Sequence, residues 1–141
     1  MAGSASLLWV AAGLVGLVTV APELDRALEP GGASHSTGFA IARAPDGQFY
    51  TEAKAGDVPL RLLVDPGAET VLLSGEDAAR MGLEVKPGFT PVTLPAIAVG
   101  PYEVQRVEAV IAPDLPVSLL GRSFLSRLAA VDVERERMVL R

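Results

Sequence analysis

Short apolar runs separated by turn residues repeat from Phe49 to the C-terminus, and this pattern constrains the fold more than any other feature. The runs recur at intervals of about ten residues, which is typical of a small all-β sandwich or barrel. The first two runs predict a hairpin that turns at Gly56 and Asp57. In the second run, alternate apolar residues share one face of the strand: Val58, Leu60, Leu62 and Val64.

The rest of the domain is also predicted to form short strands, together with two short helices. Strands are predicted at 70–73, in an antiparallel pair at 90–100 and 102–112, and in a last hairpin with a charged tip at 134–137. One short helix is predicted to begin after Ser74 and end at Gly82, and a second is predicted over 123–128. The inward face of the first helix is predicted to consist of Ala78, Ala79 and Met81.

The first 22 residues carry no charged side chain, and the stretch from Ala5 to Ala21 is almost wholly apolar. A run of about this length predicts a transmembrane signal anchor, or a signal peptide if it is cleaved. Residues 23–47 are rich in Gly, Pro, Ala and Ser and are predicted to form a flexible linker. The folded domain is therefore expected at 48–141, outside the cytoplasm, in the periplasm if anchored or secreted if the leader is removed.

Composition excludes several classes of function. The chain has no cysteine and a single histidine, so disulfides, thiolate metal sites and serine–histidine catalysis are not expected. The net charge is −5, without a basic run that could follow a phosphate backbone, so nucleic acid is not an expected partner. We expect no cofactor and no metal, and peptides or small molecules as partners in place of DNA.

The sequence LLVDPGAETVLLS raises the question of function, because a strand leads into an Asp-Pro-Gly turn that another strand follows. Most such tripeptides only form turns. Here, however, the apolar-apolar-Gly triplet Leu119-Leu120-Gly121 precedes a second helix later in the chain. The order of these features resembles the retropepsin-like aspartic peptidases, and more narrowly their bacterial membrane-anchored members. The resemblance implies a small closed β-barrel with one or two short helices, preceded by a transmembrane helix.

The resemblance also implies a catalytic mechanism. Asp65 would be the catalytic carboxylate, and one Asp-x-Gly per chain requires a homodimer in which two Asp65 side chains share a proton. Pro66, Gly67 and Ala68 would complete the active-site loop, and Gly67 would let the backbone approach the partner's loop. The loop would be supported from behind by Leu119, Leu120 and Gly121, and braced by an ion pair between Glu69 and Arg122.

Two departures from the family pattern bear on activity. The family has Thr or Ser at the position of Pro66, where its hydroxyl and N–H groups link the two Asp loops; proline has neither group. The family also carries a flap hairpin between the first helix and the next strand, whereas this chain has only LEVKPGF there. Both departures reduce the expected transition-state stabilisation.

Three functions are therefore open. The first is a membrane-anchored aspartic endopeptidase, and the second is a degenerate relative that binds peptides or serves as a scaffold. The third is a plain tethered β-domain in which Asp65 lies at an exposed turn tip, far from Leu119 to Gly121. The contact between the Asp65 loop and that segment separates the third function from the other two.

Overall fold

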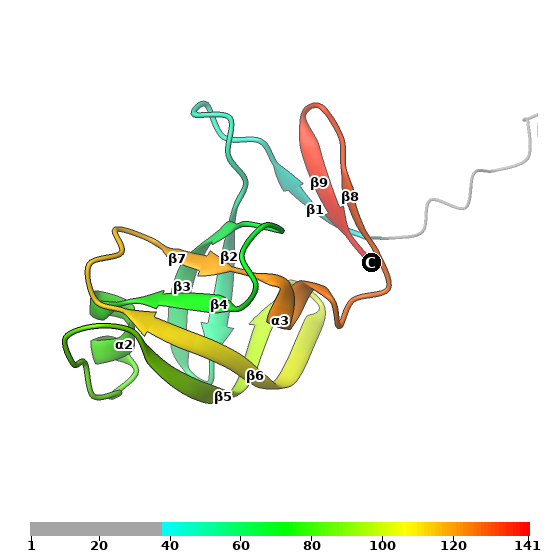
Figure 1. The fold of residues 1–141 in the computed structure, drawn as a ribbon. Coiled ribbons are helices and arrows are strands. Elements are labelled where there is room, and N and C mark those ends of the chain that lie inside the picture. The colour runs from blue at the N-terminus through cyan, green and yellow to red at the C-terminus, as the bar shows by residue number, and fades with distance from the viewer. Residues whose placement is uncertain (1–37) are drawn as a thin grey trace, which may run out of the picture. The chain divides into compact units, whose positions relative to one another are not determined.

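A computed structural model describes residues 38–141, and Figure 1 shows their arrangement. The predicted anchor at 1–22 and most of the predicted linker lie outside the described residues. Neither helix in the described part of the chain is long and apolar enough to cross a membrane.

The described residues are mostly β, as predicted, and they form a closed six-stranded barrel and a separate three-stranded sheet. The barrel order is β2-β3-β7-β4-β6-β5, and the small sheet order is β1-β9-β8. The strands are β1 Phe39–Ala42, β2 Tyr50–Ala55, β3 Val58–Val64, β4 Val71–Ser74, β5 Thr90–Val99, β6 Tyr102–Ala112, β7 Ser118–Leu120, β8 Val131–Val133 and β9 Arg137–Leu140. The helices are α2 Gly75–Arg80 and α3 Arg122–Leu125.

The linker prediction is wrong at its C-terminal end, because β1 lies within 23–47 and pairs antiparallel with β9. Ile41 in β1 is buried in the same hydrophobic core as Met138 and Leu140 of β9. Arg43 then fixes the end of β1 by donating to the carbonyl of Arg135 at 2.6 Å. A strand this short, whose partner lies at the other end of the domain, carries little local signal, which is why the sequence pattern missed it.

The predicted hairpins and strand pairs are confirmed. The β2–β3 hairpin turns at Gly56, whose φ of 61° suits glycine. The β5–β6 pair is antiparallel over nearly its whole length. Its alternation slips by one residue in the middle, where exposed Arg106 has a φ of 54° and Pro95 lies opposite in the register. Beyond this point β5 pairs with β2 through Ala98 and Lys54, which closes the barrel.

Helix α2 begins and ends where the sequence predicts. The Ser74 hydroxyl accepts a hydrogen bond from the Asp77 N–H, and Gly82 follows with a φ of 74°. Ala78 is buried and Met81 is partly buried, but Ala79 is exposed, so that part of the predicted inward face is wrong. The short helix turns only one side toward the barrel, and Ala79 lies off that side.

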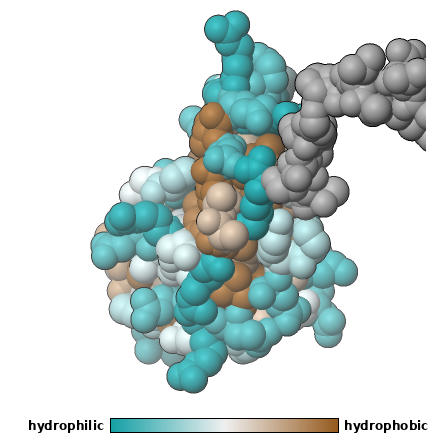
Figure 2. Space-filling view, turned by 90° about the vertical axis from the view of Figure 1, so that its right-hand side faces the viewer, coloured by the Kyte–Doolittle hydropathy of each residue, from teal (hydrophilic) through white to brown (hydrophobic). Residues whose placement is uncertain are grey.

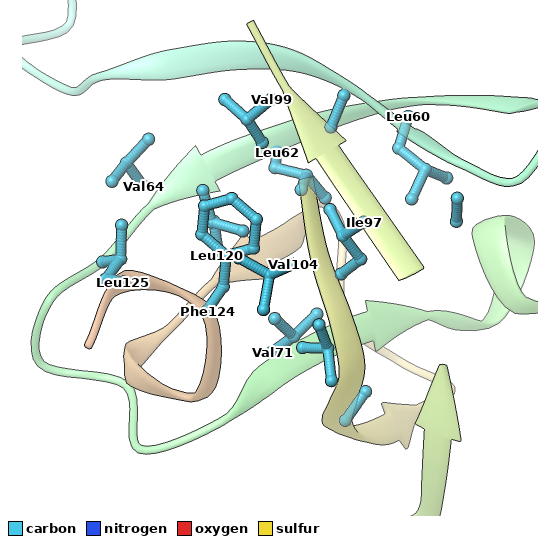
Figure 3. Packing of buried hydrophobic residues seen from close by; sticks show 14 of the residues in the cluster. Leu60, Leu62, Val64, Val71, Ile97, Val99, Val104, Leu120, Phe124 and Leu125 are labelled. Atoms are coloured by element: carbon cyan, nitrogen blue, oxygen red, sulfur yellow. The ribbon is translucent and has the colours of Figure 1, made fainter. Parts of the chain in front are cut away.

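The barrel core lies directly beneath the Asp65 loop. Figure 3 shows Leu120 and Phe124 pointing into the same cluster as Val64 and Val71, which flank the loop on either side. All four side chains are buried, and Leu120, Phe124 and Val71 are completely inaccessible to solvent. The loop therefore lies on a tightly packed core, which restricts its movement.

Candidate active site

The Asp65 loop connects β3 to β4 and contacts the segment after β7. The Asp65 N–H donates to the Leu120 carbonyl at 3.1 Å, and the Arg122 N–H donates to the Ala68 carbonyl at 2.8 Å. β3 and β7 run parallel with Val64 beside Leu120, so the hydrogen bond to Asp65 continues this ladder. These contacts contradict the plain β-domain hypothesis, which required the two segments to lie far apart.

The Asp65 side chain is half-buried and organises its own loop. Its Oδ1 atom accepts a hydrogen bond from the Gly67 N–H at 2.9 Å, and its carbonyl accepts from the Ala68 N–H at 3.1 Å. The second carboxylate oxygen has no hydrogen-bond partner within residues 38–141. One carboxylate oxygen is thus held by a hydrogen bond within the loop.

Gly67 has a local role as well as the predicted one. A Cβ atom added there would lie 3.1 Å from Asp65 Oδ1, which is tighter than ordinary contact. The missing side chain therefore leaves room for the Asp65 carboxylate. The role predicted for Gly67 in approaching a partner loop stays a prediction.

Gly121 lies where two backbone segments cross. A Cβ atom there would overlap the Thr70 carbonyl oxygen and lie 2.8 Å from that of Ala68. Both obstacles are main-chain atoms of the segment that follows Asp65, so they have little freedom to move aside. Only glycine allows this close approach.

Leu119 and Leu120 lie in β7, which pairs with β3 on one side and β4 on the other. Leu119 pairs with Leu63 of β3 and with Leu72 of β4. Leu120 points into the core and supplies the carbonyl that holds Asp65.

Glu69 and Arg122 lie close together but do not form the predicted ion pair. Both line a shallow depression of about 370 Å³ with Ser123, and the Ser123 N–H donates to the Glu69 carbonyl at 3.1 Å. No ion pair among the described residues joins the two side chains. Both are exposed, and such charges gain little from pairing in water.

Pro66 is exposed at the tip of the loop, where none of the hydrogen bonds just described uses an N–H from that position. The bend therefore forms without the hydroxyl and N–H that proline lacks. Between α2 and β5, the described backbone contains no strand and so no flap hairpin. Instead, this connection carries Phe89, which is 79% exposed.

The sequence was compared with models of known protein families. The model of the gag-polyprotein putative aspartyl protease family matches residues 51–127, more than half of the chain. The chain belongs to this family. The match covers both parts of the retropepsin-like motif, from the Asp65 loop through the glycine after β7 and into α3.

The chain has relatives in bacteria. The chain is 31% identical over 112 residues to an uncharacterised protein of Sinorhizobium, covering 68% of this chain and 48% of that protein. It is 29% identical over 115 residues to an uncharacterised protein of Rickettsia prowazekii, covering 71% of this chain and 49% of that protein. The chain thus spans about half the length of the curated relatives it matches.

The fold has a solved counterpart. The crystal structure of a retropepsin-like aspartic protease from Rickettsia conorii superposes with a TM-score of 0.67 and 29% sequence identity. The similarity covers 72% of this chain and 88% of that one. The predicted retropepsin-like barrel with two short helices is therefore confirmed.

Two residues that the sequence did not single out lie buried at the end of β7 that is opposite the Asp65 loop. Ser118 is fully buried in β7, and Asp77 is 9% exposed in the first turn of α2. The one available signal was a polar residue inside the apolar run Val117 to Leu120, where a buried hydroxyl must find a partner.

Proposed function

We propose that this chain is an aspartic endopeptidase whose active site forms between two copies, with Asp65 of each copy supplying one carboxylate. The observation that carries the proposal is the Asp65 N–H bond to the Leu120 carbonyl, which fixes a half-buried aspartate on a packed barrel. In such a pair the ionised carboxylate takes a proton from water, and the protonated one polarises the scissile carbonyl of the peptide.

Homodimerisation is part of the proposal because the chain contains a single Asp-x-Gly motif. Two-fold symmetry supplies the second carboxylate without a second motif. Figure 2 shows a band of apolar residues on the side of the molecule where α3 and β8 lie in Figure 1. The hairpin residue Val133 is 57% exposed, which also supports burial by a partner.

We further propose a low turnover. Pro66 has no N–H and no hydroxyl with which to link the two Asp loops across a dimer. The connection between α2 and β5 has no hairpin to close over a bound peptide. Misplaced carboxylates and a wetter site both lower the rate.

A second candidate function is peptide binding or scaffolding without cleavage. Pro66 favours it, because the loop keeps its bend while the N–H and hydroxyl that link the two Asp loops in the family are missing. The barrel, the closed loop and the symmetric dimer are common to both candidates, so an assay of cleavage is required to separate them.

We also propose that residues 1–22 anchor the protein as a single span, with the peptidase domain on the extracytoplasmic, periplasmic side. These residues carry no charged side chain, and a helix of this length would be long enough to cross a bilayer, which supports this proposal. Cleavage after that run would instead release the domain as a secreted protein.

Cleavage of a mixed peptide library at mildly acidic pH tests the function, with the full chain in detergent. We expect weak cleavage by the wild type and at least a roughly tenfold gain in Pro66→Thr, because hydrogen bonds restored between the two Asp loops would hold the carboxylates in place. A tenfold gain in rate corresponds to about 1.4 kcal/mol of transition-state stabilisation. Pro87→Thr, at another exposed proline far along the chain from Asp65, is the matched control and should change nothing. Peptide binding without cleavage by the wild type and by Pro66→Thr would instead establish the binding function.

A further inference from the structure

Three of the four buried polar side chains in the described part of the chain meet in one cluster. These are Ser74, Asp77 and Ser118, with exposed fractions of 5%, 9% and 0%. Burial of polar groups is costly unless they are hydrogen-bonded, and here they bond mainly to one another. A cluster of this kind fixes the elements that contribute to it.

The cluster is fully connected around the Ser118 hydroxyl. Ser118 Oγ donates to Asp77 Oδ2 at 2.5 Å and accepts from the Ser74 N–H at 2.9 Å. The Asp77 N–H in turn donates to Ser74 Oγ at 3.1 Å. The other Asp77 oxygen forms an ion pair with Arg80, so both oxygens of this buried carboxylate are used.

These bonds replace a missing part of the sheet. β7 has only three residues, and its pairing with β4 consists of one residue pair, Leu72 with Leu119. Beyond that pair, the Ser74 N–H donates to the Ser118 hydroxyl. The hydroxyl therefore extends the contact between β4 and β7 where the backbone ladder stops.

The opposite end of β7 holds the catalytic loop. Leu120, two residues after Ser118, accepts the hydrogen bond from the Asp65 N–H, and Gly121 follows under the Thr70 backbone. A shift of Ser118 would move Leu120 with it, because so short a strand is too stiff to absorb a displacement within two residues.

From these contacts we infer that Ser118 and Asp77 are positioning residues for the Asp65 loop. Their bond anchors one end of β7, so that the other end presents a fixed carbonyl to Asp65. Neither side chain touches the reacting groups, and the inference rests on the proposed function only in naming Asp65 as the carboxylate that is positioned.

Hydrogen exchange read by mass spectrometry on the full chain tests this inference without any cleavage assay. In Ser118→Ala we expect exchange in peptides covering 65–70 to rise at least about tenfold, while peptides covering 131–140 change less than about twofold. Asp77→Asn keeps the size of the side chain but removes its charge, and it should raise exchange in the same peptides. It also serves as the second variant if Ser118→Ala fails to fold.

Thr51→Val is the matched control, because Thr51 is buried but its hydroxyl bonds only to the neighbouring Glu52 carbonyl. It should leave exchange at 65–70 unchanged. An equal rise in all peptides of Ser118→Ala and Asp77→Asn would make the cluster a general stabiliser and overturn the inference, and so would unchanged exchange at 65–70. Either result is independent of whether the protein cleaves peptides.

Discussion

Gly121→Ala is expected to abolish folding of the domain or to reduce its free energy of unfolding by more than about 4 kcal/mol. The new Cβ atom would overlap the Thr70 carbonyl oxygen, and that oxygen belongs to the backbone. Relief requires separating the segment after β7 from the Asp65 loop, which would also strain the hydrogen bond from Arg122 to Ala68. A domain of this size has a total stability of about 5–15 kcal/mol, so the loss is a large part of the whole.

Thermal and denaturant unfolding followed by circular dichroism measure this effect. Gly47→Ala is the control, since Gly47 has a φ of 83° but no atom within 4 Å of an added Cβ. It should cost only about 1 kcal/mol, from the left-handed backbone alone. Comparable losses in the two variants would show that the close approach at Gly121 does not hold the loop.

Asp65→Asn is expected to lower peptide cleavage at least about a thousandfold, measured in the Pro66→Thr background where the rate is highest. An amide cannot take a proton from water, and a symmetric pair of amides has no shared proton. The fold should be unaffected, because the side-chain oxygen of the new asparagine can still accept from the Gly67 N–H that bonds to Asp65 Oδ1.

The control for this substitution is Asp114→Asn, at an exposed aspartate in another loop. Its cleavage rate should equal that of its parent. Residual cleavage in Asp65→Asn that matches Asp114→Asn would mean that Asp65 is not the catalytic carboxylate.

The strands and helices of the barrel were predictable because each has a strong local signal. Alternating apolar residues in β3 marked its buried face, and Ser74 and Gly82 marked the two ends of α2. The order of the Asp65 loop and Leu119-Leu120-Gly121 then indicated the family, which depends on the spacing of motifs and not on any single residue.

Features that depend on distant partners were not predictable in this way. β1 is a strand only because β9 pairs with it, and Ala79 is exposed because of how α2 lies on the barrel. The cluster of Ser118 and Asp77 joins residues 41 positions apart through side chains. The absence of an ion pair between Glu69 and Arg122 likewise depends on where two exposed side chains point, which the spacing of charges does not determine.

Subunit mixing tests the central claim most directly, namely that two copies of the chain share one active site. Pro66→Thr chains are mixed with increasing amounts of chains that also carry Asp65→Asn, and the cleavage rate is measured at a total concentration that keeps the protein dimeric. The account predicts that activity per Pro66→Thr chain falls in proportion to the fraction of those chains, because each mixed dimer has lost one carboxylate. Activity per Pro66→Thr chain that stays constant as inactive chains are added would contradict it.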